Sequence, residues 1–128
     1  MRLLLDSHVF IWSKVNDDRM SASAWSMLRD PENQLFFSSV SVAEMAIKIA
    51  AGKLTLGTPF GDFVEMGMRN AGIISVPLLA ASAMRLANLP AHHRDPFDRL
   101  LIATALEDDL ILLTNDSEIR KYPVRVVW

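Results

Sequence analysis

Short segments built almost entirely from apolar residues are the feature that most constrains the fold of this chain. Leu3–Leu5 and Leu110–Leu113 contain no polar side chain, and each is followed directly by a polar one. Runs of this length and composition are typical of strands covered on both faces of a parallel sheet. Three weaker segments have the same character: Leu35–Ser38, Ile73–Val76 and Val124–Val127. The sequence therefore predicts a parallel sheet of about four to five strands.

Helical segments separate these strands, and capping residues, glycines and prolines mark their ends. The expected helices run from Ser7 to about Asn16, from Ser21 or Ser23 to Asp30, from Ser41 to Gly52, from Pro59 or Phe60 to Gly72, from about Ala80 to Asn88, and from Pro96 onward. Strand and helix alternate along the whole chain without an internal repeat, which predicts an α/β fold with helices on both faces of the sheet. A length of 128 residues fits one domain over residues 1–128.

The composition removes several classes of function. The chain has no cysteine, which excludes disulfides, thiolate catalysis and cysteine metal sites. The apolar run at the N-terminus is interrupted by Asp6 and is too short for a signal peptide or a membrane span, so we expect a cytoplasmic protein without a membrane partner. A formal net charge of −2 argues against binding nucleic acid through bulk electrostatics, although an acidic centre with a basic rim is compatible with it.

The stretch His93–Ala103 predicts a buried helix that begins with acidic residues. Asp95 is a good N-cap, Pro96 suits the first helical position, and Asp98 falls at the third. The run that starts at Leu100 is too apolar for a surface helix. On a purely structural interpretation both acids only cap the helix and complement its dipole, and each contributes roughly 0.5–2 kcal/mol to stability.

Four acids from distant parts of the sequence are expected at one place. Asp6, and Asp116 or its neighbour, follow buried strands, whereas Glu44 and Asp98 are expected in the first turn of a helix. In a doubly wound sheet such positions share the rim at the carboxyl ends of the strands. For Glu44 a capping box with Ser41 is the alternative. Clustered carboxylates are costly without a cation, and oxygen ligands without cysteine suit Mg²⁺ or Mn²⁺.

These residues also resemble the motifs of a known family. Leu4-Leu5-Asp6-Ser7-His8, Glu44 in its helix, the stretch His93–Ala103, Leu113–Asp116 and the terminal Val-Val-Trp are similar to PIN-domain ribonucleases, most of all the VapC-type toxins of bacterial toxin–antitoxin pairs. The resemblance implies a PIN-like fold and a metal-dependent endoribonuclease that hydrolyses RNA to arrest translation. Its acidic quartet, which is both catalytic and metal-binding, would be Asp6, Glu44, Asp98 and Asp116.

The resemblance also implies partners. VapC-type toxins form homodimers or toxin–antitoxin hetero-oligomers, and a cognate antitoxin lays a C-terminal segment in an apolar groove near the active site. The aromatic and apolar residues of the first two helices, Phe10, Ile11, Trp12 and Trp25, either line such a groove or belong to the core.

Other residues are candidates for supporting roles. Ser7 and Thr114 stand where the family has a small hydroxyl residue, and they either orient a ligand or bond to backbone at a strand end. Asp95 is a supporting candidate with a sufficient role as a cap. Lys48, Lys53, Arg94 and Arg99 are expected near the rim, where they contact RNA or are solvated surface charges. His92 and His93 are polar loop residues, or they act near a phosphate.

The chemistry and the resemblance together suggest in-line attack by a metal-activated water on an RNA phosphodiester. The sequence offers no covalent nucleophile and leaves open the number of metal ions and the RNA that is cut, a transfer RNA loop or a ribosomal loop. Two rival functions remain: a metal-dependent phosphatase acting on small phosphate esters, although no glycine-rich loop follows Asp6, and a non-catalytic α/β binding module whose acids are only caps.

Overall fold

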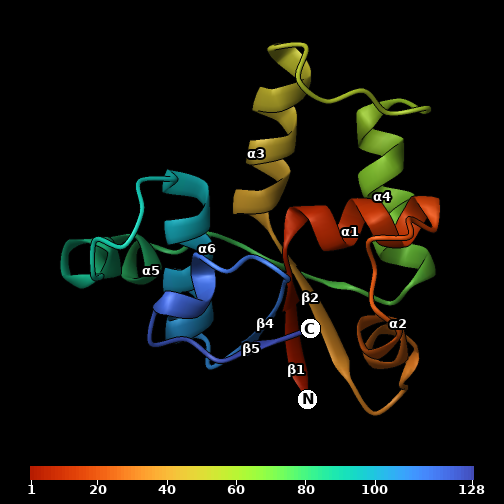
Figure 1. The fold of residues 1–128 in the computed structure, drawn as a ribbon. Coiled ribbons are helices and arrows are strands. Elements are labelled where there is room, and N and C mark those ends of the chain that lie inside the picture. The colour runs from red at the N-terminus through yellow and green to blue at the C-terminus, as the bar shows by residue number, and fades with distance from the viewer.

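The computed structural model describes all 128 residues and contains one five-stranded sheet flanked by six helices (Figure 1). The strands are β1 (Arg2–Leu5), β2 (Gln34–Ser38), β3 (Ile74–Val76), β4 (Ile111–Leu113) and β5 (Val126–Val127). The helices are α1 (Ser7–Val15), α2 (Ala22–Arg29), α3 (Ser39–Ala50), α4 (Phe60–Asn70), α5 (Ala80–Arg85) and α6 (Pro96–Glu107). Two 3₁₀ turns, η1 (Leu86–Asn88) and η2 (Ile119–Lys121), complete the chain.

The sheet is parallel throughout, as predicted, with the strand order β3-β2-β1-β4-β5. β1 lies at the centre, where Leu5 pairs with Phe37 on one side and with Leu113 on the other. The last strand is shorter than expected, because only Val126 and Val127 pair with β4. All five strands point the same way, so the residues that follow β1, β2 and β4 meet at one edge.

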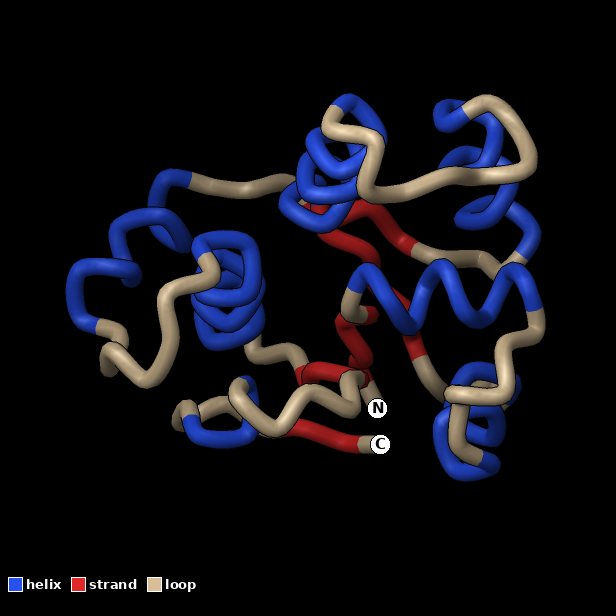
Figure 2. The backbone as a smooth tube through the Cα atoms, turned by 45° about the horizontal axis from the view of Figure 1, so that its top comes forward, coloured by secondary structure: helices blue, strands red, loops and turns tan.

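Helices cover both faces of the sheet, as predicted (Figures 1 and 2). Alternate residues of β1 point to opposite sides: Leu3 and Leu5 belong to a core with residues of α1, α2 and α4, and Leu4 belongs to a core with α6. None of the helices combines the length and apolar character needed to cross a membrane.

The aromatic residues of the first two helices form part of the core. Phe10 and Trp12 are buried, and Phe10 stacks on Phe37 of β2 with ring centroids 4.2 Å apart. Ile11 and Trp25 are half-buried and pack against the same core. Of the two interpretations of these side chains, the structure supports the core.

Two expectations about α3 are wrong. The helix begins at Ser39, because Ser38 at the end of β2 already supplies an N-cap whose hydroxyl accepts a hydrogen bond from Val40 N at 3.1 Å. Ser41 and Glu44 therefore lie inside the helix, where they cannot form a capping box, and Glu44 lies beyond the first turn. The Glu44 side chain is left free to bond elsewhere.

The start of α6 agrees with the prediction. Asp95 is the N-cap and accepts hydrogen bonds from the backbone nitrogens of Phe97 and Asp98 at 2.9 and 3.2 Å. Pro96 occupies the first helical position, and Leu101–Ala105 are buried. The predicted helix Ala80–Asn88 is in fact α5 followed by the 3₁₀ turn η1.

Candidate functional site

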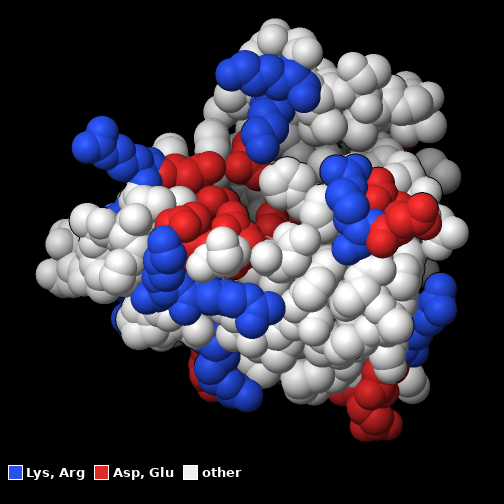
Figure 3. Space-filling model, viewed as in Figure 1, with Lys and Arg blue, Asp and Glu red and all other residues white.

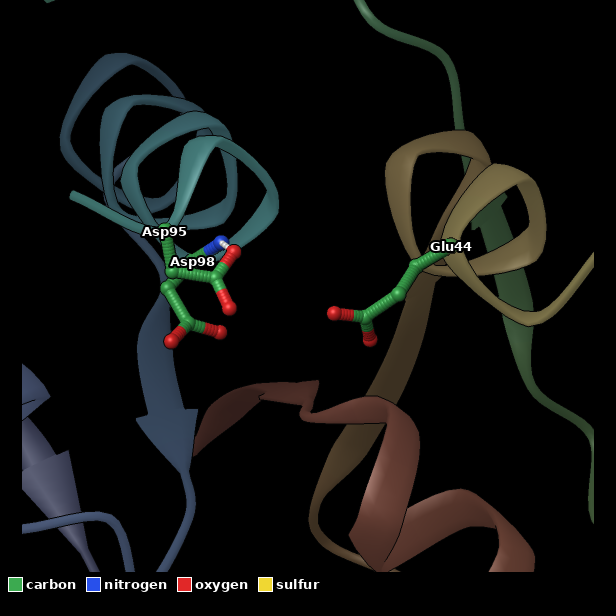
Figure 4. Close-up of side chains that lie close together, drawn as sticks. All are labelled: Glu44, Asp95 and Asp98. Carbon is green, nitrogen blue, oxygen red and sulfur yellow. Dashed lines mark hydrogen bonds between the residues drawn. The ribbon is translucent and has the colours of Figure 1, made fainter. Parts of the chain in front are cut away.

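Three carboxylates meet beyond the carboxyl edge of the sheet. Glu44 of α3, Asp95 and Asp98 each offer one oxygen atom, and these atoms lie within 4.8 Å of one another. Glu44 points across from α3 to the two aspartates at the start of α6 (Figure 4). Asp95 Oδ1 accepts both capping bonds, and its Oδ2 accepts none, so that oxygen is available to a ligand.

Ser7 links this cluster to the acid that follows β1. Its hydroxyl lies 2.5 Å from Glu44 Oε1 and 3.3 Å from Asp6 Oδ1, so it donates its hydrogen to Glu44. All three residues are buried. Because α1 begins directly after β1, with Asp6 as its N-cap, both Asp6 and Ser7 are fixed at the edge of the sheet.

Thr114, at the end of β4, links Asp6 to Asp116. Its hydroxyl donates to Asp6 Oδ2 at 2.7 Å and accepts from Asp116 N at 3.1 Å. Both hydroxyl residues, Ser7 and Thr114, thus contact carboxylates of the predicted quartet. Thr114 also makes a backbone contact of the kind that the structural interpretation assumed.

Asp116 lies beside this group rather than within the triple of closest oxygens. It is half-buried, and its Oδ1 accepts a hydrogen bond from Glu118 N at 2.8 Å. Its charge acts on Asp98, as does the charge of Asp6. The structure therefore brings the four predicted acids into one neighbourhood and adds Asp95 to it.

Burial and crowding shift the protonation of these groups. Burial, together with the charges of Asp95, Asp6 and Asp116, raises the pKa of Asp98 to about 6, although a hydrogen bond from His93 opposes the rise. Burial also acts to raise the pKa of Asp6, but interactions with His8 and Thr114 outweigh it and hold that pKa below its usual value. Asp6 in turn raises the pKa of His8.

The donor set fits a hard divalent cation. All the converging ligand atoms are carboxylate oxygens, and the nearest protein cation, Lys48 Nζ, is 3.7 Å from Glu44 Oε2. Oxygen ligands of this kind are those that Mg²⁺ and Mn²⁺ prefer. A bound cation would offset both the burial and the repulsion by neighbouring acids that raise the pKa of Asp98. The chemistry of the residues thus agrees with a metal site.

The sequence profile of the PIN domain matches residues 3–124. The chain belongs to the PIN domain family. Ribonuclease VapC22 of Mycobacterium tuberculosis (strain ATCC 25618 / H37Rv) is 30% identical over 122 residues, which make up 94% of this chain and 91% of that protein. The family resemblance of the sequence motifs is confirmed.

Solved structures of several other proteins share the fold of this PIN domain. VapBC2 from Rickettsia felis, bound to a promoter DNA fragment, has a chain that superimposes with a TM-score of 0.72 and 13% identity, covering 99% of this chain and 98% of that one. VapBC-1 from nontypeable Haemophilus influenzae gives a TM-score of 0.64 and 16% identity, covering 99% and 97%. FitAcB from Neisseria gonorrhoeae gives 0.61 and 20%, covering 98% and 96%.

Basic side chains surround the acidic centre of this PIN domain. Figure 3 shows acidic side chains gathered around a hollow, with Lys and Arg side chains above and below it. A pocket of about 160 Å³ adjoins the acids, and its lining includes Glu44, Lys48 and Lys53. Arg94 is exposed on the loop before α6. Lys48 and Lys53 therefore have access to a ligand that reaches the acids, and Arg94 lies one residue before Asp95.

Arg99 has a different position from the one expected. Its Nη1 donates to Pro90 O at 2.7 Å and to the Tyr122 hydroxyl at 3.0 Å, and its Nη2 lies 3.5 Å from Leu89 O. The guanidinium is thus used inside the protein, which weighs against the RNA contact predicted for it.

Two further residues of the PIN domain, His93 and Tyr122, lie at the site: His93 contacts Asp98, and Tyr122 contacts His93. His93 Nε2 lies 3.1 Å from Asp98 Oδ2, and His93 Nδ1 lies 2.8 Å from the Tyr122 hydroxyl. His92 is exposed and makes only an edge contact with the Tyr122 ring. The spacing of His93, five residues before Asp98 across a helix start, was the one local signal for its contact. Nothing in the sequence around Tyr122 predicts that its hydroxyl contacts His93.

Proposed function

We propose that the chain is a Mg²⁺- or Mn²⁺-dependent endoribonuclease, the toxin component of a type II toxin–antitoxin system, that hydrolyses RNA phosphodiester bonds to arrest translation in the cytoplasm. The observation that carries the proposal is the convergence of Glu44, Asp95 and Asp98 with Asp6 and Asp116 at one edge of the sheet. Membership of the PIN domain family and the similarity to Ribonuclease VapC22 support it.

The residues that would hold the cation are Asp98 and Glu44, with Asp6, Asp116 and Asp95 as neighbouring oxygen donors. A bound Mg²⁺ or Mn²⁺ supplies positive charge that activates a water molecule and stabilises negative charge on phosphate oxygens. Glu44 and Asp6 are buried and held by Ser7 and Thr114, so their carboxylates keep one arrangement before the substrate arrives.

The hydroxyl groups at the site are engaged by the acids and buried. Ser7 donates to Glu44, and Thr114 donates to Asp6. The proposed attacking oxygen is that of a water activated by the cation. Lys48, Lys53 and Arg94 supply positive charge around the acids, where they would contact phosphates of the RNA backbone.

The test is incubation of the purified chain with total cellular RNA in Mg²⁺, in Mn²⁺ and in EDTA, followed by mapping of the cut ends. Asp98→Asn should abolish cleavage. Asp62→Asn is the control, because Asp62 lies in the first turn of α4 as Asp98 lies in the first turn of α6, but Asp62 is exposed and outside the acidic cluster. Cleavage in EDTA, or full activity of Asp98→Asn, would falsify the proposal; hydrolysis of small phosphate esters without cleavage of RNA would favour a phosphatase.

The proposal includes a protein partner. Several of the similar solved structures are toxin–antitoxin complexes, and a cognate antitoxin is expected to bind this chain and inhibit it. A groove of about 460 Å³ between α1 and α4, whose lining includes Phe63 and the exposed Met66, offers an apolar surface for an amphipathic segment. Co-expression with the neighbouring gene product should give a co-purifying, inactive complex.

We also propose that the chain forms a homodimer. Ile74 on the edge strand β3, Leu78 and Leu79 in the following loop, and Met84 on α5 are exposed apolar side chains on consecutive elements. Light scattering of the purified chain should give the mass of two copies, and replacing Leu79 and Met84 by Lys should give the mass of one.

A further inference from the structure

We propose that His93 is a positioning residue: held by Tyr122 and Arg99, it fixes the Asp98 carboxylate in the orientation that a divalent cation needs. The inference rests on the proposed function, because it assigns a role toward the same metal. It concerns residues on three segments, which are the loop before α6, the first turn of α6 and the end of η2.

The observation is an unbroken chain of hydrogen bonds. Arg99 Nη1 lies 3.0 Å from the Tyr122 hydroxyl, that hydroxyl lies 2.8 Å from His93 Nδ1, and His93 Nε2 lies 3.1 Å from Asp98 Oδ2. Tyr122 is buried, and His93 and Asp98 are half-buried. Hydrogen bonds that are shielded from water in this way are stronger than exposed ones and constrain the groups that they join.

The partners of Tyr122 determine which nitrogen of His93 carries the proton. The Tyr122 oxygen accepts from Arg99 Nη1 and from His93 N at 3.0 and 3.3 Å, which uses both of its lone pairs. Its single hydrogen is then donated to His93 Nδ1 at 2.8 Å, in preference to His93 O at 3.5 Å. A neutral ring that accepts at Nδ1 must carry its hydrogen on Nε2, so His93 donates to Asp98.

Arg99 also holds the loop that carries His93. Its guanidinium bonds to the carbonyl oxygens of Pro90 and Leu89, while its backbone nitrogen bonds to Asp95 O as part of α6. The loop is thereby fixed to the first turn of the helix. The imidazole and the carboxylate consequently keep their relative positions without a bound cation.

The two carboxylate oxygens of Asp98 consequently have different roles. Oδ2 accepts from His93, and Oδ1 has no hydrogen-bond partner in the protein. The terminal torsion of an aspartate is soft, so a carboxylate without such a donor turns easily. With Oδ2 held, Oδ1 is available to a cation, and hydrogen bonds of this outer kind commonly decide metal affinity.

The first test measures Mn²⁺ affinity by calorimetry. His93→Ala should weaken Mn²⁺ binding by about 10- to 100-fold. His93→Gln should restore most of the affinity, because the glutamine Nε2 is the same number of bonds from Cα as the imidazole Nε2; His93→Asn, whose amide is one bond shorter, should not. His92→Ala removes the neighbouring exposed imidazole and should bind as the wild type does.

The second test needs no variant and no metal. Long-range ¹H–¹⁵N correlation spectra of the histidine rings distinguish the two neutral forms and the charged form. The spectrum of His93 should show hydrogen on Nε2, the nitrogen that faces Asp98, and Tyr122→Phe should remove this preference. A neutral ring with its only hydrogen on Nδ1 could not donate to Asp98, and it overturns the proposal even where the Ala variant fails to fold.

The outcomes separate this inference from the proposed function. RNA cleavage by the wild type in EDTA contradicts the proposed function. Metal-dependent cleavage by the wild type, together with unchanged Mn²⁺ affinity in both His93→Ala and His93→Asn, contradicts only the positioning role. Equal losses in His93→Gln and His93→Asn likewise count against it, because they show that reach to Asp98 does not matter.

Discussion

The hydroxyl of Thr114 donates a hydrogen bond to Asp6 Oδ2 at 2.7 Å and so joins the ends of two neighbouring strands that are 108 residues apart in sequence. Both residues are buried. This bond supplies part of the polar surroundings that keep the Asp6 carboxylate ionised inside the protein.

Replacing Thr114 by Val should destabilise the protein by about 1–3 kcal/mol, because the isosteric methyl leaves a buried carboxylate oxygen without its donor. Thr114→Ser keeps the hydroxyl and should lose less. The pKa of Asp6 is held below its usual value, so the stability that Asp6 contributes is present above about pH 4 and is lost as the pH falls through the folded-state pKa. The free energies of unfolding of Thr114→Val and Thr114→Ser, measured with denaturant, should therefore differ less at about pH 3 than at about pH 7.

Asp98→Asn should stabilise the metal-free protein at neutral pH. The folded-state pKa of about 6 exceeds the ordinary value of 3.8, so the folded protein binds more protons between these values and loses stability as the pH rises through that interval. Allowing for screening by solvent, removal of this charge should gain roughly 1–2 kcal/mol at pH 7.5. This gain in stability should vanish below about pH 4, where the Asp98 carboxyl is protonated and therefore as neutral as the asparagine that replaces it.

Addition of Mn²⁺ should make the wild type more stable than Asp98→Asn. A ligand at 100 times its dissociation constant stabilises the state that binds it by about 2.7 kcal/mol, and only the wild type should receive this gain. Melting curves of the two proteins with and without Mn²⁺ check it. Equal stabilisation of both would mean that Asp98 is not a ligand.

Substitutions of Asp95 should separate capping from metal binding. Asn is as good an N-cap as Asp, so Asp95→Asn should melt within a degree or two of the wild type while binding Mn²⁺ more weakly, because the charge is lost. Asp95→Ala should lose about 1 kcal/mol of stability as well. If Asp95→Asn binds Mn²⁺ as tightly as the wild type, Asp95 is only a cap.

Ser7→Ala should reduce the nuclease activity about tenfold, because Glu44 loses the donor that joins it to Asp6. Ser13→Ala is the matched control. Ser13 lies on the same helix, and its hydroxyl bonds only to the carbonyl of Phe10. Initial rates of cleavage of a labelled RNA, with Mg²⁺ at saturation and below it, show whether the loss is in metal affinity. Equal effects of both substitutions would assign Ser7 a purely structural part.

Local rules were sufficient for the elements that carry the acids. Leu3–Leu5 and Leu110–Leu113 are apolar enough to specify buried strands, and Asp95-Pro96 is a strong helix start. The parallel arrangement then placed Asp6, Asp98 and Asp116 at one edge, and the structure agrees.

Local rules failed where two residues competed for one role. Ser38 and Ser41 are both competent caps before the same helix, and tertiary packing of β2 selected Ser38. The contact between Glu44 and Ser7 follows from that choice and from the approach of α1 to α3. The contact of Tyr122 with His93 spans 29 residues and depends on where η2 packs, for which the sequence has no local signal.

The central position of β1, between β2 and β4, also has a consequence for the nascent chain during its synthesis. A nascent chain that has emerged only as far as α5 has Asp6 and Glu44, but it lacks Asp95, Asp98, Asp116 and the second partner of its first strand. Fragments that end before α6 therefore carry no assembled acidic cluster. A protein proposed to cut RNA becomes able to do so only after α6 and the residues that follow β4 have left the ribosome.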